Sequence, residues 1–142
     1  MNHLAEIIAH KRTEIEPLIE YTEEWKEGAR KLSLFRAFNK AVTADSFGFV
    51  AEVKRASPSA GVMAENFDPV KIALAYDAAG ANCISVLTDK KYFHGRLSYL
   101  AFIRGQVSRP LLRKDFILHE VQLYEAALAG GRCGFIDCCG DE

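Results

Sequence analysis

The 142-residue sequence lacks any apolar run of about 20 residues, the length that a helix needs to cross a bilayer. Its first residues, MNHLAEIIAHKRTEIE, also lack the apolar segment and the small-residue cleavage site of a signal peptide. An excess of one charge is missing too, because 18 Lys and Arg face 19 Asp and Glu without a run of like charges. These absences argue against nucleic acid or a membrane as a partner, and they predict a cytoplasmic protein.

Cysteine is scarce and unevenly placed. Cys133, Cys138 and Cys139 crowd near the end of the chain in a spacing that matches no common zinc pattern, and the nearest histidine in sequence is His119. Cys83 lies in the apolar run NCISVL, where a small buried side chain is the expected role. We therefore predict reduced thiols and no metal site.

What is present begins with a helical pattern over the first 20 residues. Its apolar side chains recur close to helical spacing: Leu4, Ile7, Ile8, Ile15, Leu18 and Ile19. Pro17 is expected to kink or end this helix. After the charged stretch YTEEWKEGARK, the segment SLFRAFNKAV predicts a second helix, because Leu34, Phe35 and Phe38 share one face. Residues 1–46 are thus predicted to form a helical N-terminal extension.

From residue 47 onward, apolar runs of strand length alternate with helical patterns, as in parallel βα units. Three strands are predicted, at 47–54, 81–89 and 109–116. Three helices are predicted after them, at 68–80, 98–106 and 119–131. Asp68 fits the N-cap of the first helix, Gly80 fits its end, and Ser98 fits the N-cap of the second. The units predict an α/β fold over 47–130, followed by a tail at 131–142.

The repeat of strand and helix fits either a parallel barrel or a doubly wound sheet. A nucleotide-binding doubly wound fold would place a GxGxxG pattern after its first strand, but this chain continues RASPSAGV. The barrel is therefore favoured, although the periodicity alone leaves the doubly wound sheet open.

Charged side chains stand at the carboxyl ends of two predicted strands. Glu52 and Lys54 are two residues apart and so share a face of the first strand, and Lys114 lies at the end of the third between Arg113 and Asp115. Because barrel active sites lie at this end of the strands, we predict a site that binds an anion and moves protons. The alternative is a set of ion pairs at the rim. The run of Asp89, Lys90 and Lys91 is expected to be solvated.

Two further groups of residues lie near the predicted site. Ser57 and its neighbours in the loop after the first strand would contact a phosphate or carboxylate, and a plain turn organised by Pro58 fits equally well. Phe93 and Phe116 flank the same end of the strands and would stack on an aromatic substrate, unless they are edge residues of the core.

Three long segments resemble the indole-3-glycerol-phosphate synthase family in order: FVAEVKRASPSAGVM, FDPVKIALAYDAAGANCISVLTDKKYFHG and PLLRKDFILHEVQLYEA. The resemblance covers about residues 1–130, including the N-terminal extension. It implies a (β/α)8 TIM barrel, present here as about three βα units behind extension helices. It also implies conversion of 1-(2-carboxyphenylamino)-1-deoxyribulose 5-phosphate to indole-3-glycerol phosphate, with loss of CO2 and water and with no cofactor or metal.

The resemblance also implies a role for each matching residue. Lys114 would be the general acid, and Lys54 would bind the substrate phosphate and assist proton transfer. Glu52 would orient both lysines and balance their charge. Ser57 would help to hold the substrate, whose aromatic ring would pack on Phe93 and Phe116.

The pattern departs from the family after Gly130, where GRCGFIDCCGDE replaces an apolar fourth strand. A barrel of this kind takes about 250 residues, so we expect a truncated N-terminal half that is inactive alone. An alternative is a non-catalytic half barrel, whose open sheet edge would drive self-association or pairing with a complementary C-terminal half.

Overall fold

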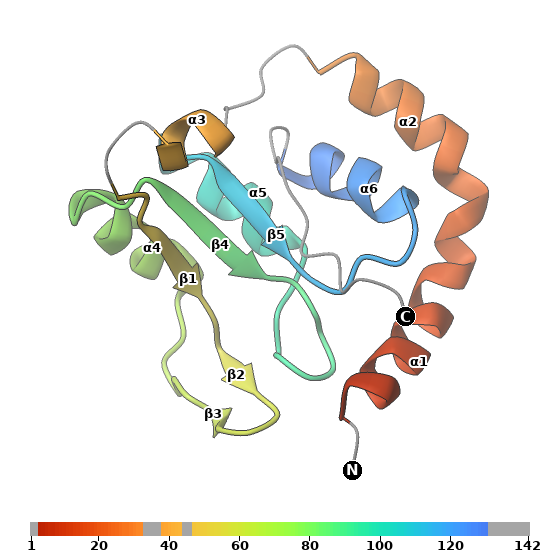
Figure 1. Ribbon diagram of the computed structural model, residues 1–142, viewed down its shortest axis with the longest axis horizontal. Helices are drawn as coiled ribbons and strands as arrows, with labels where there is room; N and C mark the ends of the chain where they lie inside the picture. The colour runs from red at the N-terminus through yellow and green to blue at the C-terminus, as the bar shows by residue number, and fades with distance from the viewer. Residues whose placement is uncertain (1–2, 33–37, 44–46, 131–142) are drawn as a thin grey trace.

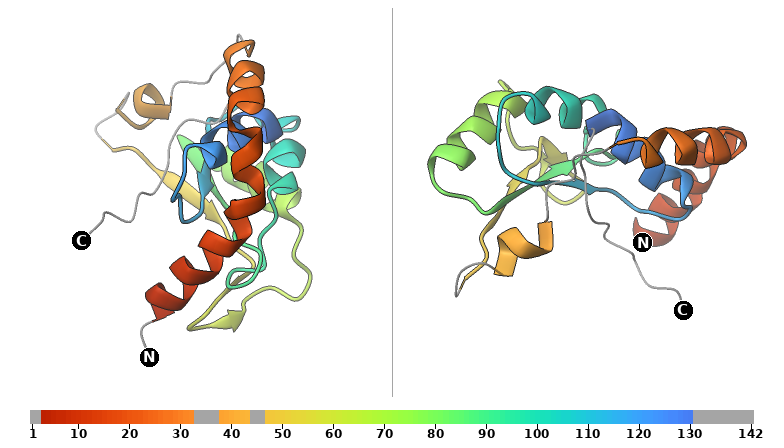
Figure 2. Two further views of the ribbon diagram at one scale, coloured as in Figure 1. Left: turned by 90° about the vertical axis from the view of Figure 1, so that its right-hand side faces the viewer. Right: turned by 90° about the horizontal axis from the view of Figure 1, so that it is seen from above.

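The computed structural model describes residues 3–32, 38–43 and 47–130 (Figure 1). Its centre is a parallel sheet in the order β1 (Val50–Val53), β4 (Cys83–Leu87) and β5 (Leu111–Lys114). The helices α4 (Pro69–Ala78), α5 (Ser98–Arg104) and α6 (Val121–Gly130) follow these strands and cover one face of the sheet (Figure 2). The prediction of an α/β fold with parallel strands is confirmed, and each predicted strand and helix of the three units overlaps an observed one.

The main core lies between the sheet and these helices. It holds alternate residues of the strands and facing residues of the helices, all at most 1% exposed: Val53, Ile84, Val86, Leu111, Ala73, Leu100 and Ile103. Since successive strand residues point to opposite faces, burying this set turns Glu52 and Lys114 to the other face. The register reinforces the pattern, because Glu52 lies opposite Ser85, and Ser85 lies opposite Leu112.

The ends of the helices follow the expected signals in one case and depart from them in another. Asp68 caps α4 by accepting hydrogen bonds from the backbone N–H groups of Val70 and Lys71, each at 3.1 Å, and Gly80 has a positive φ of 87° after the helix. The predicted Ser98 cap is wrong. Leu97 occupies the N-cap of α5 without a side-chain bond, and Ser98 is the first helical residue.

The N-terminal segment forms α1 (His3–Ile15), a 3₁₀ helix at Glu16–Tyr21 and α2 (Thr22–Arg30), which runs beside α6 (Figures 1 and 2). Pro17 lies at the start of the 3₁₀ helix, so the predicted end of α1 is confirmed. The charged stretch was not predicted as a helix, yet it forms α2. Ion pairs three residues apart, Lys26 with Glu23 and Arg30 with Glu27, line its exposed side.

The predicted apolar face of α1 is only partly buried. Ile7 and Ile15 are buried, whereas Leu4 and Ile19 are 47% and 43% exposed. The side chain buried between Ile7 and Ile15 is Lys11. The predicted helix at 33–42 overlaps α3 (Phe38–Thr43), while Leu34 and Phe35 lie outside the described residues.

The segment after β1 forms a short antiparallel hairpin of β2 (Ala56–Ser57) and β3 (Gly61–Val62), with Pro58 in its turn. A turn at Pro58 is therefore present, as one of the two interpretations of this loop predicts. Cys83 is a buried free thiol, as expected, and Cys133, Cys138 and Cys139 lie outside the described residues. No helix in the described part of the chain is long and apolar enough to span a membrane.

We predict that Gly95→Ala destabilises the protein. A Cβ at this buried glycine would lie 2.3 Å from the carbonyl oxygen of Leu87 and 2.7 Å from its carbonyl carbon, and backbone atoms cannot rotate away. The expected loss is about 1–3 kcal/mol in the free energy of unfolding, measured by urea denaturation. Gly105→Ala is the matched control, because a Cβ added there would meet nothing within 4 Å. Equal stability of the two variants would contradict the prediction.

Candidate active site at the carboxyl end of the sheet

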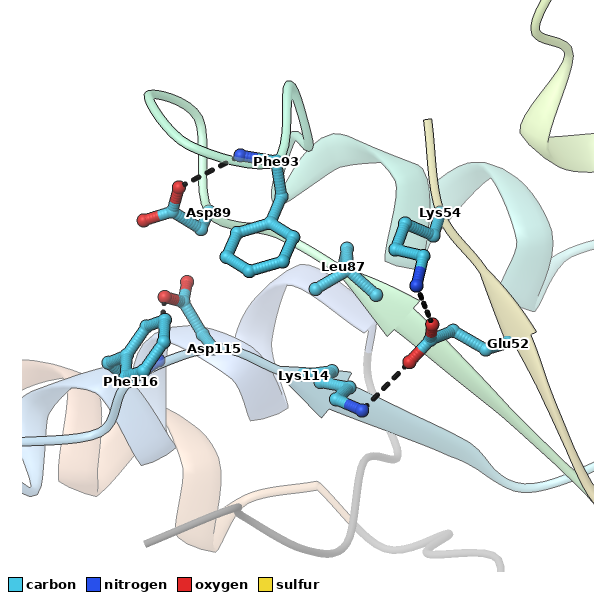
Figure 3. A pocket seen from close by; sticks show the side chains of 8 residues that line it. All are labelled: Glu52, Lys54, Leu87, Asp89, Phe93, Lys114, Asp115 and Phe116. Carbon is cyan, nitrogen blue, oxygen red and sulfur yellow. Dashed lines mark hydrogen bonds and ion pairs between the residues drawn. The ribbon is translucent and has the colours of Figure 1, made fainter. Parts of the chain in front are cut away.

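Glu52 is the centre of a charged cluster at the carboxyl ends of β1 and β5 (Figure 3). Its Oε2 lies 2.8 Å from Lys114 Nζ, and its Oε1 lies 3.0 Å from Lys54 Nζ. Burial raises the pKa of Glu52, but hydrogen bonds and charge from Lys114 and Lys54 outweigh burial and hold that pKa below its usual value. Glu52 is therefore a carboxylate at neutral pH.

The cluster carries an excess of positive charge, because two ammonium groups share one carboxylate. All three side chains remain partly accessible, with Lys114 the most exposed at 41%. Such a group attracts an anion and offers N–H donors to an oxygen that gains negative charge.

Aromatic side chains form the other part of the pocket. Phe93 comes from the loop after β4 and Phe116 from the loop after β5, and their ring centroids lie 6.3 Å apart with the planes inclined by 40°. With Leu87 at the end of β4 they make an apolar wall beside the lysines (Figure 3). One pocket thus combines an apolar wall with a cationic cluster, which suits an aromatic anion.

Two buried aspartates, Asp89 and Asp115, line the same pocket as the aromatic rings (Figure 3). Asp89 Oδ1 accepts hydrogen bonds from the backbone N–H groups of Tyr92 at 2.7 Å and Phe93 at 3.3 Å. Asp115 Oδ1 accepts one from Phe116 N–H at 2.9 Å. The expectation of a solvated charge run after β4 is therefore wrong for Asp89, whose side chain is 0% exposed because its carboxylate organises the loop. Its neighbours Lys90 and Lys91 are exposed.

Lys11 joins the two aspartates and was not predicted as a site residue. Its Nζ lies 3.0 Å from Asp89 Oδ2 and 2.8 Å from Asp115 Oδ1, and also 3.0 Å from Glu14 Oε2. Burial lowers the pKa of Lys11, but its ion pairs and hydrogen bonds with Asp115 and Asp89 outweigh that effect and raise the pKa above its usual value. The signal in the sequence was the spacing of four that sets Lys11 between Ile7 and Ile15.

Arg113 and Ser57 lie away from this pocket. Arg113 points to the helical face, where its Nη1 lies 2.8 Å from both the carbonyl oxygen of Gln122 and Oε2 of Glu125. Ser57 Oγ accepts a hydrogen bond from Ala60 N–H at 3.2 Å in the hairpin turn and does not line the pocket. Within residues 3–32, 38–43 and 47–130, no group of three or more His, Cys, Asp or Glu side chains is placed to hold a metal ion.

Comparison with known proteins identifies a single family over most of the chain. The family model for indole-3-glycerol phosphate synthase matches residues 4–136. The chain belongs to the indole-3-glycerol phosphate synthase family. The match includes every helix and strand from α2 to α6, and with them Glu52, Lys54 and Lys114.

Curated relatives named indole-3-glycerol phosphate synthase agree with this assignment. A protein from Chlorobium phaeovibrioides is 44% identical over 134 residues, which are 92% of this chain and 52% of the relative. One from Rhodopirellula baltica is 50% identical over 103 residues, or 72% of this chain and 40% of the relative. One from Geobacillus sp. is 45% identical over 127 residues, which are 89% of this chain and 48% of the relative. The chain thus spans about half the length of the curated relatives it matches.

We predict that Asp115 makes stability depend on pH in the acid range. Burial raises the pKa of Asp115, but Arg113, Lys11 and Thr88 outweigh burial and hold it below its usual value. As the pH falls, the unfolded chain therefore takes up a proton on this carboxylate before the folded chain does, at a pH of about 3.9. The free energy of unfolding decreases as the pH falls below that value.

Asp115→Asn should accordingly show a lower free energy of unfolding at pH 7 and a shallower loss between about pH 5 and pH 2, measured by urea denaturation at several pH values. Glu23→Gln, which removes an exposed carboxylate of α2, should keep the parent slope. Parallel curves for the parent and Asp115→Asn would contradict the prediction.

Proposed function

We propose that this chain supplies the proton-donating and ring-binding part of an indole-3-glycerol phosphate synthase site. The substrate would be 1-(2-carboxyphenylamino)-1-deoxyribulose 5-phosphate, and the products indole-3-glycerol phosphate, CO2 and water. The observation that carries the proposal is Glu52 held between Lys54 and Lys114, beside the Phe93 and Phe116 rings. An aromatic ring bearing a carboxylate matches this combination of apolar wall and positive charge.

Lys114 is the proposed general acid. As the ring carbon that carries the carboxylate attacks the substrate ketone carbon, the ketone oxygen gains negative charge and needs a proton. The Lys114 ammonium is held by Glu52 at 2.8 Å, and its partial exposure leaves donors free to face that oxygen. Loss of CO2 then returns its bonding electrons to the ring. The new hydroxyl group leaves as water and the neighbouring CH2 group loses a proton, which completes the indole.

Lys54 is proposed to bind the substrate phosphate and to assist proton transfer. Glu52 orients both lysines, because each of its oxygens takes one of them. Phe93 and Phe116 are proposed to pack on the aromatic ring. Ser57 is proposed to hold the substrate from the β2–β3 hairpin, which requires its hydroxyl to turn from Ala60 N–H toward the ligand.

We further propose that β1, β4 and β5 are the first strands of a (β/α)8 barrel, with residues 1–46 as an extension, 47–130 as the first three βα units and 131–142 as a divergent tail. Support comes from the parallel order β1-β4-β5 and the helices on a single face. A closed barrel needs eight strands, so the complete site would also use strands beyond these.

The decisive test is a turnover assay with the proposed substrate, which follows indole fluorescence as the ring closes. We expect no turnover from the chain alone, and activity once a polypeptide for the remaining part of the relatives' length is supplied. Turnover by the chain alone would overturn the expected dependence on a second half. No turnover in either case would overturn the proposed function.

In the assembled enzyme, Lys114→Ala should lower kcat about 10²–10⁴-fold, because the general acid is lost. Lys91→Ala is the matched control. Lys91 is an exposed lysine whose Nζ lies 5.1 Å from the centroid of the Tyr92 ring, outside the charged cluster. The kcat of Lys91→Ala should stay near that of the parent. An equal loss of kcat in both variants would overturn the role of Lys114.

The same open sheet favours a second proposal, association through the β1 edge. Phe47 and Phe49 precede this edge strand with 86% and 60% of their surfaces exposed, and a pairing partner would cover them. Either a second copy or a complementary half would serve. We expect light scattering to show a species larger than a monomer. The Phe49→Ser substitution should reduce the population of this species. A clean monomer with cooperative unfolding would contradict association.

A further inference from the structure

The buried ammonium of Lys11 connects the N-terminal helix to the loop that carries Phe93. Its side chain is 1% exposed, and two of the three carboxylates it contacts, Asp89 and Asp115, are 0% and 1% exposed, while the third, Glu14 on its own helix, is 38% exposed. These residues come from three separate parts of the chain: α1, the loop after β4 and the end of β5. Removing one partner of such a buried pair leaves an uncompensated charge, which is strongly destabilising.

The contacts of Asp89 lead directly to the pocket wall. Its Oδ1 accepts from the N–H groups of Tyr92 and Phe93, and its Oδ2 faces Lys11 Nζ at 3.0 Å. Among the described residues, Asp89 Oδ2 has no hydrogen-bond partner besides this ion pair. The position of the Phe93 loop therefore depends on a cation supplied by α1.

The wall formed by Phe116 is held in additional ways. Asp115 also pairs with Arg113, whose Nη2 lies 3.2 Å from Asp115 Oδ2, and Thr88 donates to the same oxygen at 2.6 Å. The buried Gln122 donates from Nε2 to the carbonyl oxygen of Phe116 at 2.9 Å. Loss of Lys11 should therefore disturb Phe93 more than Phe116.

A second contact joins α1 to the same loop. The Tyr92 hydroxyl donates to the carbonyl oxygen of Glu6 at 3.3 Å, and the ring of His10 meets the Tyr92 ring edge-on with centroids 5.9 Å apart. The charged cluster of Glu52, Lys54 and Lys114 is held by its own ion pairs, which do not include Lys11. The helix thus acts on the ring-binding part of the pocket and not on the acid.

We propose that Lys11 is a positioning residue, through which α1 sets the separation of Phe93 from Phe116 and hence the affinity for the aromatic part of the substrate. This inference rests on the proposed function for the identity of the ligand. The contact between Lys11 and the Phe93 loop is observed whether or not the proposed function is correct.

The first arm of the test measures the loop on the chain itself. Lys11→Met keeps the length of the side chain and removes its charge. Hydrogen exchange should show loss of protection at the Tyr92 and Phe93 amides, while the Phe116 amide stays protected. Lys26→Met, which breaks the exposed pair with Glu23 on α2, is the matched control and should change none of the three. Unchanged exchange at Tyr92 and Phe93 in folded Lys11→Met would overturn the proposal.

The second arm measures substrate affinity in the assembled enzyme. Lys11→Met should raise KM about tenfold, with kcat within about threefold of the parent. It should also raise, about tenfold, the Kd of a substrate analogue in which the ketone is reduced to an alcohol. Lys11→Arg, which keeps the charge, should restore most of the affinity. A fall in kcat at unchanged KM would overturn the proposal, because the helix would then act on the acid.

Lys11→Met in combination with Asp89→Asn covers the case in which the single variant does not fold. The amide keeps an acceptor for Tyr92 and Phe93 N–H and removes the unpaired charge, so folding should recover. KM should stay raised, because no ion pair joins α1 to the loop. A parent-like KM in this variant would overturn the proposal. If exchange changes as expected but the parent neither binds nor turns over the substrate, the proposed function fails and the positional role of Lys11 stands.

Discussion

The alternation of side chains along three parallel strands is the constraint on which the rest of the structure depends. Val53, Ile84 and Leu111 must face the helices to fill the core, and each of them turns its neighbours to the opposite face. At the carboxyl ends of β1 and β5 the residues on that opposite face include Glu52, next to Val53, and Lys114, three residues after Leu111. A shift of one residue in register would bury the lysine against the helices and expose the core.

Two clusters of charge with opposite composition contribute side chains to the pocket that Phe93 and Phe116 line. In one, the Glu52 carboxylate lies between two ammonium groups, is partly exposed and leaves positive charge for a ligand. In the other, the Lys11 ammonium lies between two aspartates that are excluded from water. The exposed cluster suits chemistry, since its groups can exchange one partner for a substrate oxygen. The buried cluster suits fixed geometry, because separating its charges in a medium of low dielectric constant is costly.

Membership of the indole-3-glycerol phosphate synthase family places the exposed cluster in a chemical context. The matched region reaches from α1 to beyond α6, and the relatives continue for about as many residues again. Among the described residues β1 and β5 are the edges of the sheet, and edge strands have backbone groups left to pair. In our proposal the same three strands therefore supply both the proton donor and the surfaces on which further strands would assemble.

The sequence by itself determined the α/β class, the order of the three βα units and the placement of Glu52, Lys54 and Lys114 at one end of the strands. Period-two spacing, apolar runs of strand length and the cap at Asp68 are local signals, and they can be read without the fold. The helix α2 escaped prediction because its stability comes from packing against α6 and from short-range ion pairs, and not from a broad apolar stripe.

Only the tertiary structure decided which charged residues are buried. Lys11, Asp89 and Asp115 look like ordinary polar residues in sequence, because the partners that neutralise each of them lie as much as about 100 residues away along the chain. Likewise, nothing local distinguishes Arg113, which faces the helices, from Lys114, which faces the pocket, until the core fixes the direction of β5. The sequence determines the type of each group by its chemistry, whereas long-range packing determines which groups meet and which of them water can reach.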